Sequence, residues 1–173
     1  MISTVSGAIA VIAGCVALGF YLAAQEGFRV NDLQELKKAL MILSSEIEHM
    51  RSPLAIASSN IAKRVKEPIG GLFSQFSNLL TKNQGETAYQ LWMQAVENQK
   101  KRSYLSNEDW DALEGFGKTL GYLDKQMQQS AITCTIEYIN EKTTSLQAQS
   151  DKNKRMFRSL GVIGGLLLVV LLW

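Results

Sequence analysis

Few side chains in this sequence are of the kinds that carry out chemistry. His49 is the only histidine, and Cys15 and Cys134 are the only cysteines. This excludes metal sites built on several histidines and leaves the cysteines without the spacing of metal ligands or of a redox pair. The glycine motifs that cradle phosphates or dinucleotides do not occur either. We therefore predict no catalytic residue, no metal and no cofactor, and a protein that is not an enzyme.

One stretch invites a chemical interpretation, and it surrounds His49. Residues 49–54 read His-Met-Arg-Ser-Pro-Leu, which compares with the phospho-acceptor box of histidine kinases, where a helical histidine precedes an acid and then Pro-Leu. Here Met50 replaces the acid, the proline comes one residue early, and no ATP-binding domain follows. A membrane-tethered signalling module with His49 as phospho-acceptor is therefore an alternative function.

Charged positions are the candidates for contacts with other proteins. Glu46 and Glu48 are two residues apart, so on a helix they face different ways and do not form a catalytic carboxylate pair. Glu46 lies beside an apolar stripe. For each candidate the alternative is a solvated or structural role. The charged candidates for interaction are Glu46, Glu48, Asp124, Lys100, Lys101 and Arg102.

The charges divide the chain into a polar middle and two apolar ends. All 18 Lys and Arg residues and all 16 Asp and Glu residues lie between Glu26 and Arg158. The net charge of +2 is too balanced for a protein that binds nucleic acid by neutralising phosphates. The middle is the size of one ordinary domain, so we expect a single domain over residues 26–155.

The N-terminal end is predicted to be a transmembrane helix. Residues 2–24 carry no charge and no proline and form roughly 34 Å of helix, enough for the hydrocarbon layer of a bilayer. A cleaved signal peptide is the alternative, but no Lys or Arg precedes the apolar run and its end lacks an A-x-A site. Gly7 and Gly14 belong to a stripe of small residues on which another membrane helix could pack.

The C-terminal end, residues 156–173, is predicted to be a second hydrophobic membrane segment. The run from Leu160 to Trp173 gives only roughly 21 Å of helix, but a start at Met156 extends it to roughly 27 Å. Gly161 and Gly165 form a GxxxG pair, a weak motif for close helix packing. Lys and Arg flank both apolar segments only on their inner sides, so the domain is expected to face the cytoplasm, with both termini outside.

Between these ends, apolar spacing predicts helices and no strands. Apolar residues recur at alternating spacings of three and four residues along the first predicted helix, which Asn31 or Asp32 can cap. These residues are Leu33, Leu36, Leu40, Leu43, Ile47 and Met50. This stripe suits either a self-associating coiled coil or the inner seam of an antiparallel bundle.

Breaks along the chain define the remaining helices. Ser52 is expected to cap a helix with Pro53 in its first turn, and Pro68 breaks that helix before the next one. A fourth helix follows with Ala88 among its inward residues, and Ser106 caps a fifth that is expected to run to a break near Gly121. The last helix is expected to reach Arg158 with an inward stripe of Met127, Ala131, Cys134 and Tyr138. The fold class is thus all-α, a single bundle of about six helices flanked by the two membrane segments.

Taken together, these residues resemble the stage III sporulation protein AB family along essentially the whole chain. The most specific stretch is Phe-Gly-x-Thr-Leu-Gly-x-x-Asp over residues 116–124. One departure is His49, where the family commonly has tyrosine. The other residues that carry the resemblance are Arg29, Leu33, Leu36, Glu46, Ile47, Pro53, Leu54, Leu72, Phe73, Trp92, Gln128, Gln129 and Ser159-Leu160-Gly161.

The resemblance implies a function and a location. Members are similar in fold to the cytoplasmic domain of type II secretion system F proteins, and they reside in the mother-cell membrane of a sporulating bacterium. The implied role is a platform and docking component of the channel complex between mother cell and forespore. Its implied partners are a secretion-type ATPase and other channel subunits, with homo-oligomers also open.

Overall fold

The computed structural model describes residues 27–50, 53–82, 85–121 and 124–172, of which residues 49, 50, 151 and 153–172 are described by their backbone alone. A first helix over 27–45 continues into a π-helical turn, η1 (Glu46–Met50). Then follow α2 (Leu54–Ala62), α3 (Ile69–Thr81), α4 (Ala88–Gln99), the 3-10 turn η2 (Lys100–Arg102), α5 (Asn107–Gly117) and α6 (Lys125–Leu172). The described residues contain helices and no strand, which confirms the all-α prediction.

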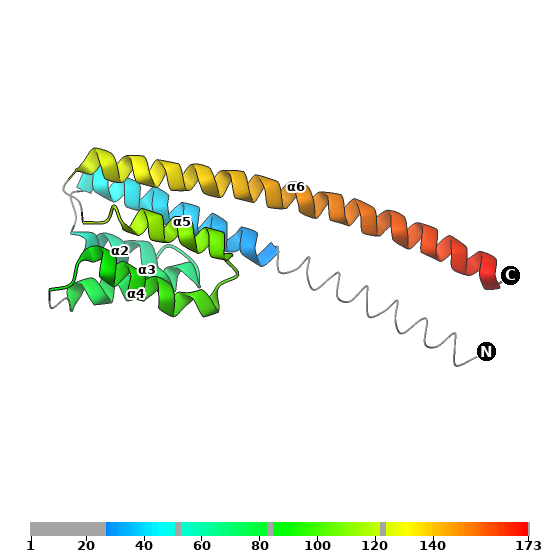
Figure 1. Ribbon diagram of the computed structural model, residues 1–173, viewed down its shortest axis with the longest axis horizontal. Helices are drawn as coiled ribbons and strands as arrows, with labels where there is room; N and C mark the ends of the chain where they lie inside the picture. Colours follow the sequence, from blue (N-terminus) through cyan, green and yellow to red (C-terminus); the bar gives the residue numbers. More distant parts are fainter. Residues whose placement is uncertain (1–26, 51–52, 83–84, 122–123, 173) are drawn as a thin grey trace.

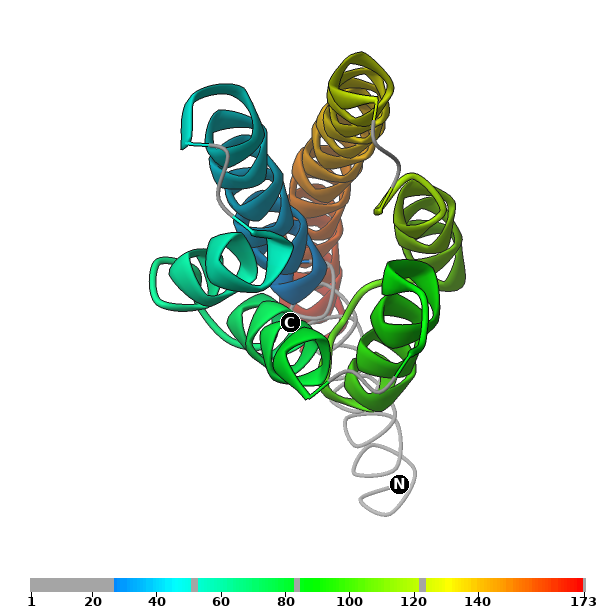
Figure 2. The same ribbon diagram turned by 90° about the vertical axis from the view of Figure 1, so that its left-hand side faces the viewer.

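The helices follow one another around a closed bundle. Each of α2 to α5 packs against the next helix along the chain, and Figure 2 shows the first helix closing the ring between α2 and α6. The first helix and α6 run antiparallel and side by side, and α6 then continues well beyond the bundle (Figure 1). Ser44 Oγ donates to Gln129 Oε1 at 2.6 Å, and Gln129 Nε2 donates back to the Ser44 carbonyl at 2.8 Å.

The leucine stripe of the first helix forms part of the bundle core. Leu33, Leu36, Leu40 and Leu43 are almost completely buried within the single chain, and Ile47 packs against the same core. A coiled-coil dimer through this stripe is therefore contradicted, because its seam is already filled by the chain's own helices.

Aromatic side chains fill the centre of the core. Trp92 of α4 is fully buried and makes edge-to-face contacts with Phe73, Phe76 and Phe116 at centroid distances of 5.0–5.7 Å. Its indole N–H donates to the Leu113 carbonyl at 2.9 Å. A buried tryptophan needs such a partner, so the bond fixes how α4 and α5 face each other.

The start of α5 is as predicted, but its end is not. Ser106 and Asp109 form the predicted capping box. However, the helix ends at Gly117, four residues before the expected break. Thr119 Oγ1 donates to the Phe116 carbonyl at 2.7 Å, and Gly121 has a φ of 91°, in the left-handed region that favours glycine. The predicted break at Gly121 is therefore the end of a turn that begins four residues earlier.

The last helix is longer than predicted and buries a partly different stripe. Its core-facing residues include Ile132, Thr135 and Ile139, whereas Met127 and Cys134 are exposed. The predicted stripe is confirmed for Ala131 and Tyr138, which pack against the core, and is wrong for Met127 and Cys134, because the adjacent stripe carries the isoleucines.

Among the side chains of α6 that the structure describes, Leu146 is the last that packs on the core, and 147–172 continue as helix. Within the part of the chain whose residues are described, no helix is both long and apolar enough to cross a membrane. The predicted segment 2–24 lies outside the described residues, and for 156–173 they include only the helical backbone to Leu172.

Candidate functional site

A polar junction joins the first helix, α5 and α6 at the end of the bundle from which α6 extends. It consists of Arg29, Ser106, Asp109 and Tyr138. Arg29 Nε donates to Asp109 Oδ2 at 2.8 Å, while Nη2 donates to Asp109 Oδ1 at 3.1 Å and to Ser106 Oγ at 2.8 Å. Tyr138 Oη donates to Asp109 Oδ1 at 2.9 Å. One buried carboxylate thus binds three elements together.

The electrostatics of the polar junction favour the ionised carboxylate. Burial acts to raise the pKa of Asp109, but hydrogen bonds from Arg29, the Ser106 backbone and Tyr138 outweigh it and hold that pKa below its usual value. Burial and the bond to Asp109 raise the pKa of the Tyr138 hydroxyl. The junction therefore holds fixed charges and a neutral phenol, an arrangement suited to structural locking.

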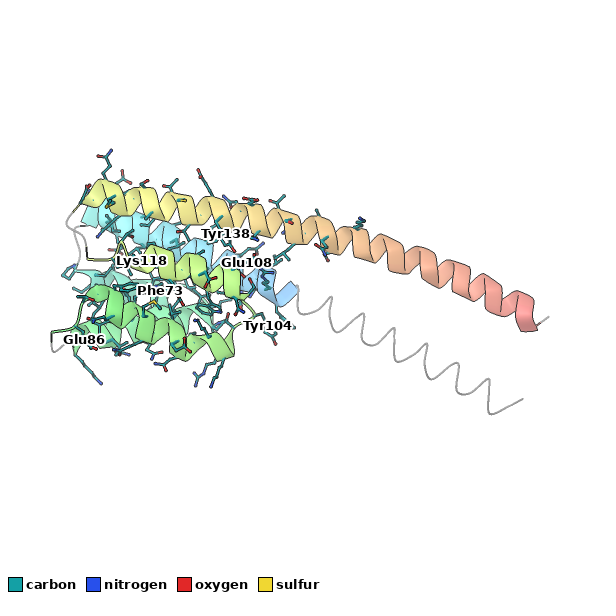
Figure 3. The ribbon with its side chains drawn as sticks, in the orientation of Figure 1. Phe73, Glu86, Tyr104, Glu108, Lys118 and Tyr138 are labelled. Atoms are coloured by element: carbon teal, nitrogen blue, oxygen red, sulfur yellow. The ribbon has the colours of Figure 1, made fainter. Side chains whose placement is uncertain are left out.

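Further contacts reinforce the polar junction. Lys142 Nζ donates to Glu108 Oε2 at 2.6 Å and lies 5.5 Å from the centroid of the Tyr138 ring, and Figure 3 shows Tyr138 and Glu108 where α6 faces α5.

Asp32 is buried and accepts from the Tyr104 backbone N–H at 2.8 Å. Burial raises the pKa of Asp32, although the bonds from Tyr104 and Ser103 counteract this.

The polar junction was only partly visible in the sequence. The capping box of Ser106 and Asp109 was predicted, and Arg29 was among the residues that carried the family resemblance. Their pairing was not predicted, because Arg29 and Asp109 are 80 positions apart in the chain. A lone arginine in the first turn of an otherwise leucine-lined helix was the available signal.

The second candidate site surrounds Glu46, the first residue of the π-helical turn. Glu46 is only 5% exposed. Asn60 Nδ2 of α2 donates to its Oε1 at 3.2 Å, while Oε2 finds no hydrogen-bond donor among the described residues. The carboxylate lines an open groove of about 440 Å³, the Glu46 groove, together with Gln34, Lys37, Lys38, Met41, Ile42, Ser45 and Arg64.

The other charged candidates lie apart from this groove. Glu48 is exposed, and Asp124 is exposed at the start of α6, where its Oδ1 accepts from the Gln126 N–H at 2.9 Å. Asp124 therefore caps a helix, whatever else it does.

The basic group forms η2, directly after α4. Lys100 bridges Glu97 and Glu114 at 3.2 and 3.0 Å, and its hydrogen bond to Glu114 is the main reason that its pKa is raised. Lys101 and Arg102 are exposed. The basic group thus contains one lysine in ion pairs and two exposed cations.

Several predicted positions cannot be placed. Gly7 and Gly14 lie outside the described residues, and so does the side chain of His49. Gly161 and Gly165 lie within the helical backbone of α6, with surroundings that are not described. In the part of the chain that was described, no cluster of three or more His, Cys, Asp or Glu side chains could hold a metal ion.

Comparison with known proteins decides the family. The model of the family described as stage III sporulation protein AB matches residues 4–173. The chain belongs to this family. It is 32% identical over 166 residues to the stage III sporulation protein AB of Bacillus subtilis (strain 168), covering 96% of each chain. A solved structure of a stage III sporulation protein AB matches with a TM-score of 0.67 and 31% identity, covering 72% of this chain and 98% of the other.

Family membership confirms the resemblance and gives the chain a role in sporulation. It also explains the most specific stretch, because Phe116 to Gly121 form the end of α5 and the turn after it. Phe116 joins the aromatic cluster, and a Cβ on Gly117 would collide with the Trp92 indole. The stretch that carried the resemblance therefore lies where α4 and α5 pack closely together.

Proposed function

We propose that this member of the stage III sporulation protein AB family is a non-enzymatic membrane platform of the channel complex between mother cell and forespore. The bundle faces the mother-cell cytoplasm and docks a secretion-type ATPase, and the apolar segments 2–24 and 156–173 engage the membrane and other channel subunits. The type II secretion F-like fold and the domain limits at 26–155 are part of this proposal.

The observation that carries the proposal is the way α6 is held. The helix is continuous from Lys125 to Leu172, and the polar junction and Ser44–Gln129 bonds fix its first part against the bundle. The far end has the apolar sequence expected of a membrane segment. A charged bundle rigidly joined to an apolar end suits a platform that holds partners at a membrane.

The test is made in sporulating cells. One strain carries the chain without residues 26–155, with the two apolar segments joined by a flexible linker, and a second strain carries the whole chain. We expect the first to lose co-purification of the ATPase and of the other channel subunits and to lose heat-resistant spores. Normal channel assembly and normal spore counts without the bundle would rule the proposal out.

A further inference from the structure

The Glu46 groove combines a buried acid with three cations. Glu46 is buried, Lys37 is half-buried, and Lys38 and Arg64 are exposed. The groove is fixed between these elements by main-chain contacts: Lys38 Nζ donates to the Arg64 carbonyl at 2.5 Å, and the Lys66 N–H donates to Glu35 at 3.0 Å. The groove is therefore a formed feature of the bundle surface.

Glu46 lacks the compensation that buried carboxylates normally have. Its only hydrogen bond among the described residues is the 3.2 Å contact from a neutral amide, Asn60, and it leaves Oε2 without a donor. A buried charge needs several strong donors or a cation to offset the loss of water. Glu46 is also the first residue of a π-helical turn, a distortion that occurs frequently at functional sites.

We propose that the Glu46 groove receives a segment of a protein partner that inserts one Arg or Lys side chain at Glu46 and places carboxylates on either side of it. Because Oε2 is buried in this structure, the Glu46 side chain turns toward the groove on binding, and the inserted cation then donates to Oε2 in a charge-assisted bond. The flanking carboxylates meet Lys37 and Arg64, and the exposed Met41 gives the segment an apolar contact. This inference rests on the proposed docking function and names the chemistry of one docking surface.

Two other occupants fit less well. A metal ion would need more anionic ligands than the single carboxylate that lines the groove. An anionic lipid headgroup would suit the three cations, but it would bring negative charge next to the buried Glu46 carboxylate. A mixed, mainly acidic peptide segment with one basic side chain complements both parts of the groove.

The experiment uses the full chain in sporulating cells, with a photo-activatable amino acid in place of Met41. The matched control carries it in place of Met127, which is equally exposed, 54% against 55%, but lies on α6. We expect a cross-linked protein at position 41 that is absent at position 127. Both Glu46→Gln and Lys37→Glu should weaken this cross-link by about tenfold or more, while Lys82→Glu, an exposed charge outside the groove, should leave it unchanged.

Charge exchange completes the test. Mass spectrometry of the adduct should show a segment with one basic residue between acidic residues. Replacing that basic residue by Glu should abolish the cross-link, and combining it with Glu46→Lys should restore it. The inference is overturned if position 41 captures only lipid or nothing. It is equally overturned if Glu46→Gln and Lys37→Glu leave the yield of the cross-link unchanged. It is also overturned if the captured segment has no basic residue. Channel subunits that still co-purify with these groove variants would leave the proposed platform function standing.

Discussion

At the scale of single residues, Asp109 joins three elements. Its carboxylate accepts hydrogen bonds from Arg29 of the first helix, from the Ser106 backbone N–H and from Tyr138 of α6. The side chain is fully buried, whereas that of Arg29 is 21% exposed. Because every bond is made to a charged acceptor, the group acts as a single lock on three elements.

Asp109→Asn tests that lock. The amide leaves Arg29 without a charged partner, and we expect a loss of about 3 kcal/mol in the free energy of unfolding. Lys142→Gln is the control, since it breaks an exposed ion pair to Glu108 and should lower the stability far less than Asp109→Asn. Thermal unfolding of the detergent-purified chain, followed by circular dichroism, measures both. Equal melting temperatures for the two variants would contradict the assignment.

Asp109 and Asp32 should respond to pH in opposite directions. The pKa of Asp109 is lowered in the folded state, so its contribution to stability is present at neutral pH and is lost as the pH falls below about 4. The pKa of Asp32 is raised, so its ionised form opposes folding once the pH exceeds that folded-state value.

The measurement compares melting temperatures between pH 7 and pH 3. Asp32→Asn keeps an oxygen for the Tyr104 N–H, so it should match or exceed the wild type at pH 7 and lose any advantage in acid. Asp109→Asn should be less stable at pH 7 and approach the wild type in acid. If the melting temperatures of the two variants changed with pH in the same way, the opposite pKa shifts of Asp109 and Asp32 would be contradicted.

Among the elements, α5 contains two glycines with different surroundings. Gly117 faces the Trp92 indole at a distance that leaves no room for a Cβ, whereas a Cβ on Gly115 of the same helix meets nothing within 4 Å. The two glycines therefore have different effects on the structure. One permits close packing of α4 and α5, and the other only lowers helix propensity.

Alanine at each position separates these effects. Gly117→Ala should destabilise the fold by about 2 kcal/mol, because the indole must move within a packed core. Gly115→Ala should stabilise it by about 0.5–1 kcal/mol, because alanine is the better helix former. Urea unfolding of the purified chain gives both values. A stabilising Gly117→Ala would show that the aromatic cluster can yield.

Local signals explain which parts of the fold were predictable. The proline before α3, the capping box of α5 and the leucine stripe of the first helix act within a few residues, and each was placed correctly from sequence. The start of α2 was one residue off, because Pro53 is its N-cap and does not lie in its first turn. The end of α5 was placed too late, because the chain leaves the helix in a local turn in which Thr119 Oγ1 donates to the Phe116 carbonyl. The stripe of α6 was partly displaced because two apolar stripes lie side by side on that helix.

The candidate site was less predictable than the fold. Glu46 was singled out from its place beside an apolar stripe, but its burial and its groove depend on Asn60 and Arg64 from another part of the chain. The polar junction likewise requires side chains brought together by the whole bundle. Sequence spacing on one helix carries no information about such partners.

Across the whole molecule, the continuous α6 connects the bundle to the C-terminal apolar segment. Residues 147–172 span roughly 39 Å of helix beyond the last core contact. Ala148→Pro should kink this helix but leave the melting temperature of the bundle nearly unchanged, because position 148 is exposed and beyond the core. If the platform needs a rigid connection, heat-resistant spores should fall sharply.

The control is Ala148→Gln, which keeps a good helix former at the same exposed site and should sporulate normally. Spore counts after heating and circular dichroism of the purified chains are compared for both variants. Normal sporulation with Ala148→Pro would show that a straight α6 is dispensable.

The antiparallel pairing of α6 with the first helix also has a mechanical consequence. A pull along α6 from its C-terminal end would act parallel to the axes of both helices, so their contacts would be loaded in shear and would share the force. Peeling would instead break the contacts one after another. The polar junction lies at the end from which α6 extends, so its bonds and the Ser44–Gln129 bonds would carry the load together, and the bundle would survive until they ruptured together.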